Sequence, residues 1–117
     1  MGNAMNMWRE RISAVSGATS VSLYSDYVRE GERWFVERVT VMDDTTSLAN
    51  CLVSIDAVTH IHPLYAFRSL TTSVHTGQTL QCWLREGERL RFDWTSVGAA
   101  DTLQMHVTGH KQKVDKP

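Results

Sequence analysis

The chain has little of several features that would define its class at once. Of its 117 residues only two are proline, seven glycine and two cysteine, so it contains no flexible low-complexity linker. No apolar run approaches the roughly 20 residues needed to cross a bilayer, and the first twenty residues lack the basic-then-apolar order of a signal peptide. We therefore expect neither a membrane segment nor export, and buried thiols rather than a disulfide at Cys51 and Cys82.

An excess of charge of either sign is also missing. Twelve Lys and Arg stand against 13 Asp and Glu, a net charge of −1, which gives no electrostatic reason to expect nucleic acid or an anionic membrane as a partner. With 42% hydrophobic and 21% charged residues, the composition is that of a globular protein with a modest core. We expect one domain over residues 18–110, preceded by an N-terminal arm (1–17) and followed by a charged tail (111–117).

The N-terminal segment has three large apolar residues at helical spacing. Met5, Trp8 and Ile12 alternate with charged residues in a pattern that predicts a short amphipathic helix ending near residues 16–17. These side chains are costly to leave in water, so something should cover them. The alternatives are a helix docked on its own domain or a frayed terminus, and an arm that reaches a neighbouring subunit. Under the second alternative the three residues are interface residues.

From residue 18 onward the pattern is that of β-strands. Apolar and polar residues alternate with a period of two, and turn signals recur every eight to twelve residues. Residues 58–67 contain Pro63, which suits an edge or bent strand, and residues 70–76 are a further candidate strand that ends at Gly77. The seven or eight strands predict an all-β fold, an antiparallel β-sandwich of jelly-roll type. We expect these residues in its core: Leu23, Val36, Val53, Leu80, Leu84, Leu90, Phe92, Trp94, Leu103, Met105 and Val107.

The word REGER occurs twice, at residues 29–33 and 85–89. In each copy an apolar strand ends, Glu-Gly makes a tight turn in which Gly adopts positive φ, and a new strand begins with a large apolar residue. Equivalent corners of two related halves would explain the repeat, as would chance repetition of a common hairpin turn.

The sequence contains few residue patterns that indicate catalysis or metal binding. His60 and His62 share one face of a strand and are the best metal-ligand candidates, but Pro63 follows at once and the next acidic residue is Glu86. Asp43 and Asp44 lie in a polar turn, where solvated carboxylates are the rule. Nucleophile motifs and phosphate-binding glycine loops are missing. We therefore expect surface or interface histidines, no metal, no cofactor, no catalytic residue and no enzymatic activity.

Two stretches resemble a known family. "REGERWFVERVTVMDDTTS" and "LREGERLRFDWTSVGAADTLQMHVTGHK" are similar to the opening strand and the closing hairpin of small jelly-roll virion proteins of tailed bacteriophages. The opening pattern maps onto residues 30–36 and the closing one onto residues 85–109, with Ala100 where glycine is frequent. Residues 1–16 lie outside the resemblance.

The resemblance implies a capsid decoration (cement) protein or a head-tail accessory protein. Such a protein would be located in the virion, would bind the major capsid protein or other virion subunits, and would form a homo-oligomer. A carbohydrate-binding module of a phage fibre or tail is the alternative, because Trp34, Trp83 and Tyr65 could stack on sugars, although aromatic residues at period-two spacing usually belong to the core. A cupin-like metalloenzyme using His60 and His62 is the third possibility.

Overall fold

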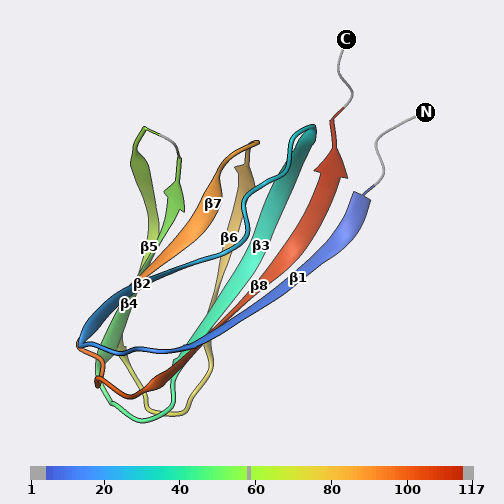
Figure 1. The fold of residues 1–117 in the computed structure, drawn as a ribbon. Coiled ribbons are helices and arrows are strands. Elements are labelled where there is room, and N and C mark those ends of the chain that lie inside the picture. Colours follow the sequence, from blue (N-terminus) through green and yellow to red (C-terminus); the bar gives the residue numbers. More distant parts are fainter. Residues whose placement is uncertain (1–4, 58, 115–117) are drawn as a thin grey trace.

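The computed structural model describes residues 5–57 and 59–114, with Met5 described by its backbone alone. In this part of the chain eight strands form two four-stranded antiparallel sheets that face each other (Figure 1). Sheet A contains, in spatial order, β1 (Met5–Val15), β8 (Thr102–Lys113), β3 (Glu32–Asp43) and β6 (Thr76–Leu84). Sheet B contains β2 (Ser20–Tyr24), β7 (Arg89–Thr95), β4 (Ala49–Asp56) and β5 (Ile61–Leu70).

The strand order is that of a jelly roll. The pairs β4–β5, β3–β6, β2–β7 and β1–β8 are nested like one long folded hairpin, and successive pairs alternate between the two sheets. Rolling such a hairpin brings β8 beside β3 and β7 beside β4, which closes each sheet. The predicted all-β antiparallel sandwich is therefore confirmed.

The N-terminal helix prediction is wrong. Residues 5–15 form an extended edge strand that pairs with β8 along its whole length, from Met5 opposite Gln112 to Val15 opposite Thr102. Residues four apart share a face both in a helix and in a strand, so the spacing of Trp8 and Ile12 fits either structure. The open edge of β8 decides between them, because pairing there satisfies the backbone hydrogen bonds of both strands. The sandwich thus begins at β1 rather than at residue 18.

The core lies between the sheets and agrees closely with the sequence prediction. Nine of the eleven predicted residues are buried, while Leu23 and Leu80 are partly buried and pack against the core. Sequence analysis did not place Trp8 there, yet its side chain is 1% exposed and its ring lies 4.9 Å from that of Trp34.

No helix of the described residues is long and apolar enough to cross a membrane.

Three strand boundaries differ from the predictions. Residues 71–75 form a connection, and β6 starts at Thr76 and runs through Gly77. Strand β8 continues through Gly109 to Lys113, into the predicted tail. Gly109 lies against the bulge of β3 between Val36 and Arg38, where the chains approach too closely for a side chain. Strand β5 is an edge strand with a register shift near Pro63, as predicted.

The two REGER copies form adjacent turns at one end of the sandwich. Both glycines adopt positive φ, +76° at Gly31 and +82° at Gly87, as the turn prediction requires. The Gly31 N–H donates to Glu86 Oε1 at 2.8 Å, and the Gly87 N–H donates to the Val28 carbonyl at 3.0 Å. The two REGER copies therefore form the turns of the β2–β3 and β6–β7 connections, and hydrogen bonds join these connections to each other.

Candidate functional site

Of the three predicted interface residues, the two with described side chains, Trp8 and Ile12, do not form a free apolar face. Trp8 is buried, and its Nε1–H donates to Glu10 Oε1 at 3.1 Å. Ile12 is half-buried and packs against the core, whereas the side chain of Met5 lies outside the described residues. The exposed large apolar residues of β1 are Met7 and Val15. An intermolecular role of this segment stays a prediction.

The two candidate ligand histidines lie together at the surface. The rings of His60 and His62 meet edge to face with centroids 4.3 Å apart, and both side chains are exposed. With Trp83 and Glu88 they line a hollow of about 560 Å³. Among the described residues neither histidine belongs to a cluster of three potential metal ligands. The geometry thus brings the pair together without a third ligand.

Three aromatic residues were candidates for sugar stacking. Trp34 is buried, whereas Trp83 on β6 and Tyr65 on β5 are exposed and lie on different sheets. The guanidinium of Arg33 lies 4.5 Å from the centre of the Trp83 ring. Because a cation at this distance covers part of the ring, Trp83 is only partly available for stacking.

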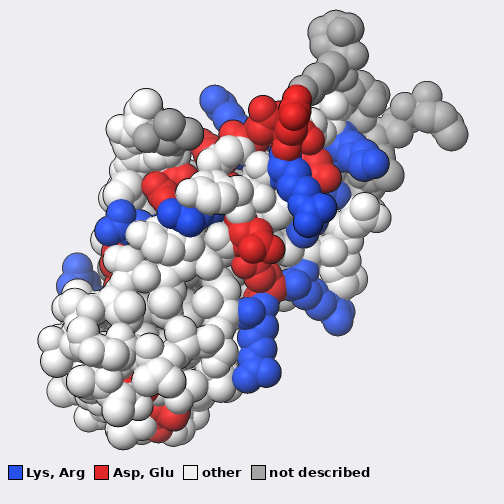
Figure 2. Space-filling view, in the orientation of Figure 1, with Lys and Arg blue, Asp and Glu red and all other residues white. Residues whose placement is uncertain are grey.

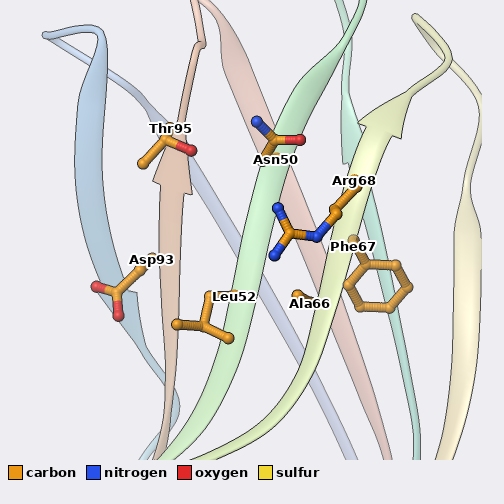
Figure 3. Close-up of a pocket in the computed structure, with 7 residues that line it drawn as sticks. All are labelled: Asn50, Leu52, Ala66, Phe67, Arg68, Asp93 and Thr95. Atoms are coloured by element: carbon orange, nitrogen blue, oxygen red, sulfur yellow. The ribbon is translucent and has the colours of Figure 1, made fainter.

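The outer face of sheet B carries a shallow groove of about 250 Å³ (Figure 3). Figure 3 shows the Arg68 side chain reaching from β5 between Asn50 and Leu52 of β4. The Asn50 amide oxygen accepts the Ser69 N–H at 2.9 Å, and Asp93 lies at the far side on β7. The groove offers hydrogen-bond donors and acceptors of the kind that bind a polar ligand.

Both cysteines are free, as predicted. Burial, with a smaller effect of Asp93, raises the pKa of Cys51 well above its ordinary value. Burial and then Glu88 raise the pKa of Cys82 to about 11. Because the thiolate is the nucleophile and the metal ligand, neither thiol is prepared for catalysis or for metal binding at neutral pH.

The end of the sandwich opposite the REGER turns is almost free of positive charge. Four connections meet there, at residues 16–19, 44–48, 71–75 and 96–101 (Figure 1), and we call them the loop end. They contain no Lys or Arg, and the lowest part of the molecule in Figure 2 shows a red patch and no blue. Val15, at its border, is 64% exposed, Leu48 64% and Val74 47%. Isolated apolar residues in polar segments carry no periodic signal, so sequence analysis missed this surface.

Asp43 is not the solvated charge that the sequence predicted. Asp43 is 1% exposed and Asp101 4%, while Asp44 is half-buried. The Asp43 Oδ1 atom accepts the N–H groups of Thr45 and Thr46 at 3.1 and 3.3 Å, which shapes the turn after β3. Nothing in its sequence surroundings marked Asp101 as a partner of Asp43.

Comparisons with known proteins identify the fold. No family model matches the chain, and no curated protein matches it in sequence. A structure of Bacillus endospore appendages, which form a family of disulfide-linked pili, matches with a TM-score of 0.60 and 12% identity, over 97% of this chain and 91% of that one. A structure of infectious bursal disease virus, Gx strain, matches with a TM-score of 0.51 and 7% identity, over 95% of this chain and 32% of that one. At such identities the likeness shows a shared β-sandwich fold.

Proposed function

We propose that the chain is a virion structural protein of the capsid decoration type, which binds neighbouring capsid subunits through its loop end and has no enzymatic activity. The observation that carries this proposal is the loop end, where Val15, Leu48 and Val74 are exposed and the four connections contain no Lys or Arg.

The physics of association favours this end as the contact. Burying an exposed aliphatic side chain stabilises a complex by roughly 1.5–3 kcal/mol. Desolvating an unpaired Lys or Arg would offset that gain, and this surface has none to desolvate. Cores of protein interfaces are likewise depleted of charge. The opposite end, with the two REGER turns, is rich in both signs of charge and suits a solvated surface.

Two further points support an assembly role. The sequence resembles phage virion proteins over residues 28–109, and two structures with the same fold come from assemblies, a pilus and a virus. The proposal accordingly includes a homo-oligomer, the major capsid protein or another virion subunit as partner, and a location in the virion.

The test uses one charge at each of two exposed aliphatic positions. Leu48→Asp places a carboxylate in the loop end, and Ile61→Asp is the matched control because Ile61 is an exposed residue of β5 near the other end. In sedimented lysates of the phage that encodes the chain, we expect wild type and Ile61→Asp to cosediment with heads. Leu48→Asp should lose at least about tenfold in occupancy. Sedimentation of wild type with neither heads nor tails, or equal occupancy of all three proteins, refutes the proposal.

The groove on sheet B favours a second candidate, a carbohydrate-binding module. Three of its lining residues, Asn50, Arg68 and Asp93, could pair with sugar hydroxyls, although no exposed aromatic ring lines the groove. A glycan-array signal that disappears in Arg68→Ala while Leu48→Asp retains it would favour this candidate over capsid decoration.

A further inference from the structure

The carboxylates of Asp43, Asp44 and Asp101 come together where two connections between the sheets cross. Asp43 ends β3, Asp44 follows in the β3–β4 connection, and Asp101 precedes β8 in the β7–β8 connection. One carboxylate oxygen of each residue lies within 4.8 Å of the other two. Two hydrogen bonds hold the connections together: the Asp44 N–H donates to the Thr102 carbonyl at 3.2 Å, and the Thr102 N–H donates to Asp44 Oδ1 at 2.9 Å.

One oxygen in this cluster is buried and has no hydrogen-bond donor. The Asp43 Oδ2 atom accepts no hydrogen bond among the described residues, and Asp43 is only 1% exposed, so solvent cannot readily supply a donor. A carboxylate oxygen of Asp101 lies within 4.8 Å of a carboxylate oxygen of Asp43. A buried acceptor without a donor costs about 1–3 kcal/mol, and more when it is charged, so two facing carboxylates require a proton or a cation between them.

The surroundings supply no positive charge from the protein itself. Among the described residues none of the three carboxylates forms an ion pair, and the connections around them contain no Lys or Arg.

Gly98 lets the side-chain oxygens of Asp101 and Thr46 lie close to its backbone. Gly98 donates its N–H to Asp101 Oδ2 at 2.8 Å. A Cβ atom at Gly98 would lie 2.5 Å from Asp101 Oδ1 and 2.9 Å from Thr46 Oγ1, so only glycine lets this connection close over the carboxylate and the hydroxyl. The Thr46 hydroxyl is thus a fourth oxygen beside the cluster.

We infer that Asp43, Asp44 and Asp101 bind a Ca²⁺ ion, which links the β3–β4 and β7–β8 connections at the loop end. The donors are all hard oxygens, which suit Ca²⁺ and Mg²⁺ rather than Zn²⁺. Two ligands on opposite sides of one ion are separated by about 4.6–5.2 Å for Ca²⁺ and about 4.2 Å for Mg²⁺. The three oxygens lie within 4.8 Å of one another, so one Ca²⁺ ion can contact all of them. This inference does not depend on docking by the loop end.

The experiment is thermal unfolding of the full chain after dialysis against EDTA, with Ca²⁺ or Mg²⁺ added back, and calorimetric titration with CaCl₂. We expect 5 mM Ca²⁺ to raise the Tm by at least about 5 °C, and Mg²⁺ to raise it less. Asp43→Asn and Asp101→Asn should lose the response. Asp26→Asn is the matched control, because Asp26 is exposed and distant from the cluster, and it should respond like wild type.

The outcomes separate a cation from a shared proton. In EDTA, Asp43→Asn should unfold at a temperature no lower than that of wild type, because an amide can donate to Asp101 where a carboxylate repels it. A wild-type Tm that is equal in Ca²⁺ and EDTA, with no heat on titration, means that the pair holds a proton only and overturns the inference. A full Ca²⁺ response in both Asp43→Asn and Asp101→Asn overturns it as well.

Discussion

Replacing Trp8 by alanine tests whether β1 belongs to the core or is a detachable arm. Trp8 is 1% exposed, and its ring lies 4.9 Å from that of Trp34. Truncation of a buried Trp costs about 3–5 kcal/mol because transfer energy is lost and a cavity remains. Domains of this size are stable by about 5–15 kcal/mol, so Trp8→Ala removes a large fraction of the total.

The assay is urea unfolding followed by circular dichroism, with Met7→Ala as the matched control on the same strand. Met7 is exposed, and its truncation should change the free energy of unfolding by no more than about 0.5 kcal/mol. If Trp8→Ala is as stable as Met7→Ala, Trp8 does not pack in the core in solution. An unfolding midpoint that rises with protein concentration in wild type but not in Trp8→Ala would show instead that Trp8 is covered by a neighbouring copy.

Two further predictions concern single sites. Gly109→Ala should destabilise the protein by about 3 kcal/mol or more, because the new Cβ would lie 1.8 Å from the Phe35 carbonyl oxygen, a backbone atom that cannot rotate away. An unchanged urea midpoint, with Thr108→Ala as the control, would contradict the predicted clash. The Cys82 thiol, with its pKa raised from 9.0 to about 11, should react with a disulfide reagent at pH 8 about 100-fold more slowly in the native protein than in urea, and faster as the pH rises toward 11. Equal reaction rates at pH 8 in the native protein and in urea would refute the raised pKa of Cys82.

The sandwich could be predicted from the sequence because its signals are local. Period-two alternation marks strands such as β7, where Leu90, Phe92 and Trp94 point inward, and the two Glu-Gly turns carry their own conformational signal. The helix prediction failed because the spacing of Trp8 and Ile12 is common to helix and strand. The open edge of β8, which selects the strand over the helix, is almost a whole chain length away in the sequence.

The acidic cluster was beyond sequence analysis for a similar reason. Asp43 and Asp101 meet only because the jelly roll brings the β3–β4 and β7–β8 connections to the same end. Taken alone, Asp43 followed by Asp44 and two threonines is typical of a solvated turn. Burial by the neighbouring connections turns Asp43 into a desolvated group, and burial of that kind follows from topology rather than from composition.

The pairing of β1 with β8 has a consequence for folding kinetics. Strand β1 hydrogen-bonds to no strand other than β8 among the described residues, so it has no sheet partner until β8 is available. Pairing such distant segments requires costly loop closure, and folding should therefore take milliseconds to seconds. During synthesis Trp8 leaves the ribosome before β8 is made, so β1 stays unpaired until β8 follows. This delay exposes an apolar edge strand to aggregation, so slower translation of the segment between β1 and β8 should lower the yield of soluble protein.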